Sequence, residues 1–156
     1  MKLLFISIGK TRNKNQQALI EEYLARVKGY LPSEFIEIRE PKNISSMDAA
    51  QAIKAEGEFF RKYIGSGAYT FVLSEEGKNY STKEFASQLS KKMNGGFKSI
   101  NFIIGGPFGI SDEVKKASNE VISLSKLTFT HEMARVIILE QVYRAMTMIR
   151  GEKYHY

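Results

Sequence analysis

Five short apolar runs, each followed by a segment with helical periodicity, constrain the fold more than any other feature of this chain. The runs are rich in Val, Ile, Phe and Leu and cover residues 3–8, 35–38, 69–73, 100–104 and 121–124. Runs of this length between turn signals are typical of strands. Their regular alternation with helical segments predicts an α/β fold in which a mostly parallel sheet is flanked by helices on both faces.

Capping signals locate the starts of three of the helices between these runs. Ser81 and Glu84 form a capping box of the S-x-x-E type, and Ser45 with Asp48 forms a looser version of it. Ser111 is positioned to cap a further helix. Together with the strands, these signals indicate five consecutive strand–helix units.

Length and composition are those of one folded unit. With 156 residues and no linker rich in Pro, Gly or Ser, residues 1–156 are expected to form a single domain. The opening MKLLFISIG is interpreted as a buried first strand, not a signal peptide, and no run approaches the ~20 apolar residues of a membrane helix. The sequence contains no Cys, which excludes disulfides and thiolate metal sites and favours a cytoplasmic protein.

The positive charge of the chain is concentrated after the first predicted strand. The formal net charge is +6, and Lys10, Arg12 and Lys14 form the densest basic cluster. Such a cluster is suited to an anionic partner, although a lysine-rich face that is merely solvated gives the same pattern.

Three loops leave the carboxyl ends of the last three predicted strands, beginning at Leu73, Gly105 and Leu124. Ligands of parallel α/β sheets bind beyond the carboxyl ends of the strands, so the loops are expected to converge if these strands are neighbours. The glycines of GGPFG match neither the dinucleotide pattern G-x-G-x-x-G nor a Walker loop. They offer backbone that a flat ligand can approach closely, or they form only a tight strand-to-helix turn.

The third loop, LSKLTFTH, combines small hydroxyls with apolar side chains. Ser125 and Thr128 can hydrogen-bond a ligand that Leu127 and Phe129 wall off, or the hydroxyls can satisfy local backbone groups. His131 has no second His or Cys near it, so we expect no metal, and a lone histidine in the first turn of a helix is more often structural.

The last predicted helix spans 131–150, with Thr130 as its N-cap and Gly151 just past its end. It is apolar almost all round and therefore has to be buried on more than one side. A second copy of the chain can cover one side, giving a two-fold dimer, or the helix can be buried entirely within the monomer.

Two arginines of this helix have acidic neighbours at helical spacing. Glu132 can pair with Arg135 and Glu140 with Arg144, as exposed ion pairs, unless one arginine instead meets a phosphate or a substrate carbonyl. Beyond the helix, EKYHY has the side chains to stack on an unpaired base, or it is simply a frayed terminus.

The segments IGGPFG, SLSKLTFTHEMARV and EQVYRAMTMIRGEKYHY, with LLFISIGK, EEYLARV, KAEGE and VLSEEGK before them, carry a resemblance that covers essentially the whole chain. The chain resembles the SPOUT-class family of large-subunit ribosomal RNA pseudouridine methyltransferases, type H. That resemblance implies an α/β fold with a deep C-terminal trefoil knot, a rare exception to the rule against knotted chains. It further implies a homodimer that uses S-adenosylmethionine, without a metal, to methylate N3 of a pseudouridine at the ribosomal subunit interface.

The resemblance also implies roles for individual residues. Arg144, Tyr154 and His155 would act on the substrate side, in a pocket built with the partner subunit, and Lys10, Arg12 and Lys14 become the expected RNA-binding cluster. The residues expected to contact the methyl donor lie in the three loops and are Leu73, Gly105, Leu124, Ser125, Lys126, Leu127, Thr128 and Phe129.

N3 of pseudouridine carries an imide proton that has to leave before the nitrogen can attack. His155 is the expected base, because an unperturbed imidazole titrates near neutral pH, and Arg144 is expected to stabilise the charge on a neighbouring carbonyl. The chain departs from the family at Thr130, where Pro is usual, and at Tyr156, where a basic residue is frequent. A non-catalytic RNA-binding module and a nucleotide-dependent enzyme of flavodoxin-like architecture are the alternatives.

Overall fold

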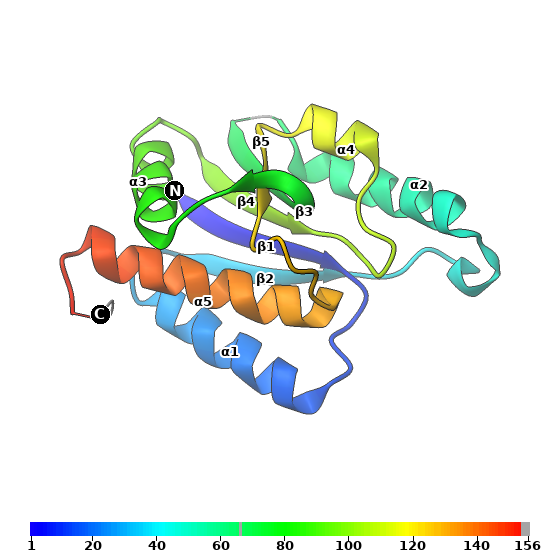
Figure 1. Ribbon diagram of the computed structural model, residues 1–156, viewed down its shortest axis with the longest axis horizontal. Helices are drawn as coiled ribbons and strands as arrows, with labels where there is room; N and C mark the ends of the chain where they lie inside the picture. The colour runs from blue at the N-terminus through cyan, green and yellow to red at the C-terminus, as the bar shows by residue number, and fades with distance from the viewer. Residues whose placement is uncertain (66, 154–156) are drawn as a thin grey trace.

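Five parallel strands form one sheet in residues 1–65 and 67–153, which are the residues that the computed structural model describes (Figure 1). The strand order is β2-β1-β4-β3-β5, and every neighbouring pair is parallel. The α/β fold with a parallel sheet is therefore confirmed. The strands are β1 (Lys2–Ile8), β2 (Ser33–Ile38), β3 (Ala68–Asn79), β4 (Ser99–Ile104) and β5 (Glu120–Ser123).

Helices cover both faces of this sheet, as expected for buried parallel strands. Successive residues of β1 point to opposite faces, so Leu3 and Phe5 belong to one hydrophobic core and Leu4 and Ile6 to the other. The first core is covered by α1 (Lys14–Lys28), α3 (Thr82–Met93) and α5 (His131–Ile149). The second is covered by α2 (Ala49–Phe60) and α4 (Asp112–Ala117), and two short 3₁₀ turns, Ile44–Ser46 and Arg61–Tyr63, flank α2.

The predicted caps are confirmed with one correction. Ser81 and Glu84 form the capping box of α3, and Ser111 accepts from the backbone N–H of Val114 at the start of α4. Ser45 does not cap α2, because it lies inside the preceding 3₁₀ turn. Asp48 is the cap instead, in a capping box with Gln51.

The loop expected to begin at Leu73 is part of a longer strand. β3 continues to Asn79, and both Leu73 and Lys78 pair with Ile122 of β5, so residues 74–77 bulge out of the sheet. A Cβ at Gly77 would lie 2.5 Å from the carbonyl carbon of Ile122, which only glycine avoids. The bulge thus brings Glu75 and Glu76 out beyond the carboxyl end of the sheet.

α5 lies on the sheet between α1 and α3 and runs alongside α1 (Figure 1). Val136, Ile138, Leu139 and Val142 are all buried by these neighbours within one chain. The monomer therefore accounts for much of the apolar surface of the helix. Thr130 caps it as predicted, and Gly151 follows its end with a φ of +72°.

Arg135 is fully buried, so its prediction as an exposed partner of Glu132 was wrong. Its guanidinium donates to the carbonyl oxygens of Ile8 (2.6 Å) and Gly9 (3.1 Å) and to the hydroxyl of Thr11 (2.8 Å), and it lies 3.5 Å from the Glu37 carboxylate. The reason is that α5 starts beside the carboxyl end of β1, where free carbonyls need donors.

Glu132 instead accepts from backbone N–H groups of the segment that follows β1. These are the N–H groups of Arg12 (2.7 Å) and Asn13 (3.2 Å). The second predicted pair is present, because the Nε of Arg144 donates to the Glu140 carboxylate over 3.1 Å, but it is partly buried and not exposed as expected. The two arginines of α5 therefore have different functions in the fold.

Replacing Arg135 by Met should lower the free energy of unfolding by about 3–5 kcal/mol, because two strand-end carbonyls lose their buried donor and the Glu37 carboxylate loses its cationic partner. Urea denaturation followed by circular dichroism measures this change. Arg61→Met is the matched control, since that guanidinium is 63% exposed and its ion pairs should contribute less than about 1 kcal/mol. Equal losses in the two variants would show that the buried guanidinium does not hold α5 to β1.

Candidate active site

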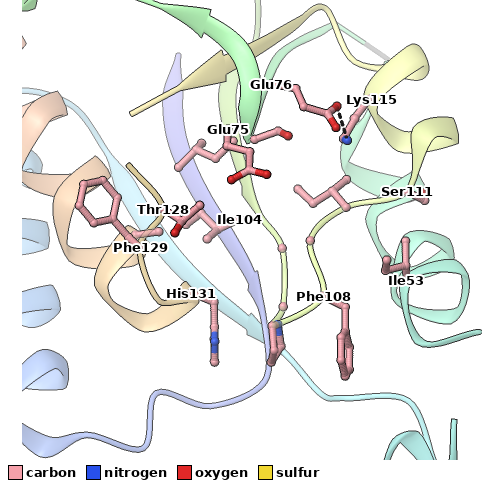
Figure 2. A pocket seen from close by; sticks show the side chains of 18 of the residues that line it. Ile53, Glu75, Glu76, Ile104, Phe108, Ser111, Lys115, Thr128, Phe129 and His131 are labelled. Atoms are coloured by element: carbon pink, nitrogen blue, oxygen red, sulfur yellow. Dashed lines mark hydrogen bonds and ion pairs between the residues drawn. The ribbon is translucent and has the colours of Figure 1, made fainter. Parts of the chain in front are cut away.

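A cavity of about 970 Å³ opens at the carboxyl ends of β3, β4 and β5 (Figure 2). These strands are neighbours, so the predicted convergence is present, with the bulge of β3 after Leu73 in place of the first of the three loops. Figure 2 shows Thr128 and Phe129 on one side of the cavity and Ile53 and Ser111 on the other. The start of α5 adds His131 and Ala134 to the wall.

Seven of the eight residues expected to contact a methyl donor line this cavity. Lys126 is the exception: it is exposed and is not part of the lining, although it lies between two residues that are. The lining residues from the predicted set are Leu73, Gly105, Leu124, Ser125, Leu127, Thr128 and Phe129.

The glycine loop turns back on itself so tightly that position 105 has no room for a side chain. A Cβ at Gly105 would lie 2.5 Å from Cγ1 of Ile110 and 2.6 Å from the carbonyl oxygen of Gly109. Gly109 has a φ of +93°, and its N–H donates to the Gly106 carbonyl over 3.1 Å. The tight strand-to-helix turn is thus present, and its bare backbone also forms a wall of the cavity.

The hydroxyls of Ser125 in the third loop and of Ser123 at the end of β5 both bond to backbone of that loop. Ser123 donates to the carbonyl of Ser125 (2.7 Å), and the Ser125 hydroxyl accepts from the N–H of Leu127 (3.0 Å). This is the local alternative considered from the sequence. Leu127 is 75% exposed and Phe129 42%, so both apolar side chains stand at the open side of the cavity.

His131 was interpreted from the sequence as structural, but it lines the cavity. Figure 2 shows its ring and that of Phe108 extending in the same direction at one edge. Partial burial lowers the pKa of His131, and the nearby Arg135 cation lowers it further, so the imidazole is neutral at physiological pH. His131 directly follows Thr130, the N-cap of α5, at the end of the loop that was expected to line the cavity. That position was the signal that could have identified it.

Glu56 of α2 was not singled out from the sequence either. It is 2% exposed, and its two carboxylate oxygens lie 2.7 and 2.8 Å from the position of a Cβ on Gly106. Burial raises the pKa of Glu56 to about 7; the N–H of Gly106 lowers it and the charge of Glu40 raises it. The signal was its spacing, because Ala52, Glu56 and Phe60 follow one another every four residues along the buried face of α2.

Of the residues expected on the substrate side, Arg144 is described by the structure, and it does not line the cavity of its own chain. Arg144 follows His131 by thirteen residues of the same helix, which corresponds to about 20 Å along its axis. Tyr154 and His155 lie outside the described residues. Lys10, Arg12 and Lys14 are exposed and are not part of the lining, but Glu132 holds the Arg12 backbone beside the start of α5.

Within residues 1–65 and 67–153, no cluster of three or more His, Asp or Glu side chains is arranged to hold a metal ion. In the same part of the chain, no helix has the length and apolar character needed to span a membrane.

Comparison with known proteins identifies what this arrangement is similar to. Residues 1–155 match the family described as Predicted SPOUT methyltransferase. A Flavobacterium psychrophilum protein named Ribosomal RNA large subunit methyltransferase H is 41% identical to the chain. The match covers 100% of the chain and 99% of that protein. The chain is 42% identical, with the same coverage, to a Parabacteroides distasonis protein of that name. A crystal structure of a probable methyltransferase from Bordetella pertussis Tohama I shares the fold, with a TM-score of 0.58, 10% identity and coverage of 92% of this chain and 93% of that one.

Glu56 should make the stability of the protein fall as the pH rises. Its pKa of about 7 lies above the 4.5 of a solvated glutamate, so its contribution is complete below pH 4.5 and is lost on ionisation up to about pH 7. Between pH 5 and pH 8 the free energy of unfolding should therefore fall by up to about 3 kcal/mol more in the wild type than in Glu56→Gln. Urea denaturation at both pH values measures the difference.

The exposed Glu58 on the same helix provides the control for this measurement. Glu58→Gln should retain the pH dependence of the wild type. If Glu56→Gln retained it as well, Glu56 would not be the group that titrates.

Proposed function

The chain belongs to the SPOUT methyltransferase family, and from this premise we propose that it transfers a methyl group from S-adenosylmethionine to N3 of a pseudouridine in large-subunit (23S) ribosomal RNA. The observation that carries the proposal is the convergence of the loops at Leu73, Gly105 and Leu124 on one cavity. The names of the full-length relatives supply the substrate class. Family membership argues against the two alternatives, a non-catalytic RNA-binding module and a flavodoxin-like enzyme.

The cavity suits a flat ligand that carries a positive charge. The Gly105 backbone allows close approach, because a Cβ there would be blocked by Ile110 and Gly109. The wall also carries more acidic than basic side chains: Glu75, Glu76, Asp112 and Glu113 against Lys54 and Lys115. When bound, S-adenosylmethionine supplies a methyl carbon that its sulfonium makes electrophilic.

The task of the protein is then to align the reacting groups and to exclude water. The backbone of the three loops holds the donor, while Leu127 and Phe129, exposed at the open side, would be covered when the RNA or a second subunit closes the cavity. His155 is proposed to take the imide proton from N3, and Arg144 to stabilise the negative charge left on a neighbouring carbonyl. Tyr154 is proposed to stack on the base.

These substrate-side residues imply a homodimer. About 20 Å of helix separates Arg144 from the start of α5, which is farther than an arginine side chain reaches. Arg144 and the tail would therefore serve the cavity of a second copy. The proposal includes the family's trefoil knot, formed by the segment from Leu124 onward.

The RNA substrate is proposed to be the ribosome itself. A net charge of +6 is modest for holding RNA alone, even with Lys10, Arg12 and Lys14 gathered beside α5, so the assembled particle would supply much of the recognition surface. Such a substrate implies work in the cytoplasm.

Transfer of labelled methyl to assembled ribosomes, separated subunits and free 23S rRNA tests the reaction and its substrate together. We expect label on the large-subunit RNA, with the fastest transfer to assembled ribosomes. Gly105→Ala is the inactive control, because the added Cβ cannot fit in the loop. Absence of transfer to all three substrates, with the donor bound, would contradict the proposed activity.

His155→Ala should slow single-turnover transfer by at least about 100-fold while the dissociation constant of S-adenosylmethionine, measured by calorimetry, stays unchanged. His131→Ala is the matched comparison, because His131 is the histidine that lines the cavity of its own chain. If only His131→Ala lost turnover, the base would be His131 instead.

Mixing two inactive variants tests the shared site. Arg144→Ala should lose turnover far more than donor affinity, and Gly105→Ala should lose donor binding. A heterodimer of the two contains one complete site only if Arg144 acts on the partner's cavity. Mixing should therefore restore activity, and each heterodimer should reach up to about half the activity of a wild-type dimer. If mixing restored nothing although heterodimers formed, Arg144 would act within its own chain or elsewhere.

A further inference from the structure

α2 supports the glycine loop from behind at both of its ends. At one end the Glu56 carboxylate packs against Gly106, so closely that a Cβ on Gly106 would overlap both oxygens. At the other end a Cβ on Gly57 would lie 2.8 Å from the Ser111 hydroxyl, which caps α4. Glu56 and Gly57 do not line the cavity themselves, so this pair supports the loop from within the wall that α2 forms beside the cavity.

The Glu56 carboxylate is a buried charge without a cationic partner among the described residues. Its Oε2 has no hydrogen-bond partner there, and Glu40, the charged side chain that influences it, has the same sign. The other charged side chains on α2 and on α4, which packs against it, are Lys54, Glu58, Asp112, Glu113, Lys115 and Lys116. A buried carboxylate of this kind is costly and is retained only where its charge or its shape is used.

We propose that the Glu56 carboxylate, acting through the glycine loop, makes the cavity prefer the cationic methyl donor over its neutral product, S-adenosylhomocysteine. This inference rests on the proposed function. It concerns a residue that does not line the cavity and that therefore acts as a specificity-determining charge in its wall.

The physical basis is the difference of one charge between the two ligands. On transfer a carbon–nitrogen bond forms between the methyl group and N3, whose proton goes to the proposed base, while the carbon–sulfur bond breaks. The electron pair of that bond stays on sulfur, so the sulfonium becomes an uncharged thioether. A negative charge in a poorly hydrated wall attracts the sulfonium and has no comparable attraction for the thioether. The carboxylate therefore strengthens donor binding and leaves the product comparatively weakly held. Protonation of Glu56 reduces this difference in affinity.

Calorimetric titration of both ligands at pH 6 and pH 8 tests the proposal. The ratio of the dissociation constant of S-adenosylhomocysteine to that of S-adenosylmethionine should rise between these pH values by about three- to tenfold more in the wild type than in Glu56→Gln. Titration of His131 and of the ligands' own amino groups is common to both proteins, so it cancels in this comparison. Glu58→Gln, on the exposed face of α2, should behave as the wild type.

A second measurement needs no variant. By linkage, the ligand that Glu56 favours has to lower the pKa of Glu56, so the ¹³C shift of its carboxyl should titrate about 0.5–1 pH unit lower in the donor complex than in the product complex.

The outcomes separate this inference from the function on which it rests. Equal pH dependence of the ratio in wild type and Glu56→Gln, or equal carboxyl titration in the two complexes, would overturn it. Equal weakening of both ligands in Glu56→Gln at both pH values would reduce Glu56 to a packing role and would also overturn it. If the wild type bound neither ligand at either pH, the proposed function itself would fail, and the inference with it.

Discussion

The buried guanidinium of Arg135 joins the end of the first strand to the start of the last helix. Parallel strands leave backbone carbonyls free at their carboxyl ends, and Arg135 supplies donors to those of Ile8 and Gly9 without admitting water. The same residue fixes how α5 begins and therefore how the preceding loop crosses the sheet. The cavity residues from Leu124 to Ala134 lie between β5 and this anchor, although Arg135 itself does not line the cavity.

Most of the fold could be predicted because its signals are local. The five apolar runs, the capping box at Ser81 and the cap at Thr130 each depend on a few adjacent residues, and the structure retains all of them. The sequence also predicted that the segments beginning at Leu73, Gly105 and Leu124 converge, because the carboxyl ends of parallel strands lie at one edge of the sheet. The bulge in β3 could not be predicted in this way, since it depends on the close passage of Gly77 over Ile122 of another strand.

The incorrect prediction for Arg135 and the missed roles of Glu56 and His131 also come from contacts between segments that are distant in the sequence. Arg135 has Glu132 at helical spacing, so a local rule predicts an exposed pair, but the carbonyls to which Arg135 donates are more than a hundred residues away in the sequence. Glu56 and His131 resemble, respectively, a solvated helix residue and a structural histidine until α2 and α5 are placed beside the glycine loop. Their chemistry is determined by burial and by neighbours, which a single sequence does not contain. The tail residues Tyr154 and His155 remain predictions.

The strand order also has a consequence for how the chain is made. β1 is an interior strand of the sheet and pairs with the central strand β4, as Lys2 does with Ser99, so this pairing joins segments that are synthesised at very different times. Folds dominated by such distant contacts form slowly and expose apolar strand edges while they wait. Until α5 has emerged and Arg135 has closed onto Ile8, a nascent chain has only part of its ligand cavity. The cavity is thus completed in one late event, once α5 has been made.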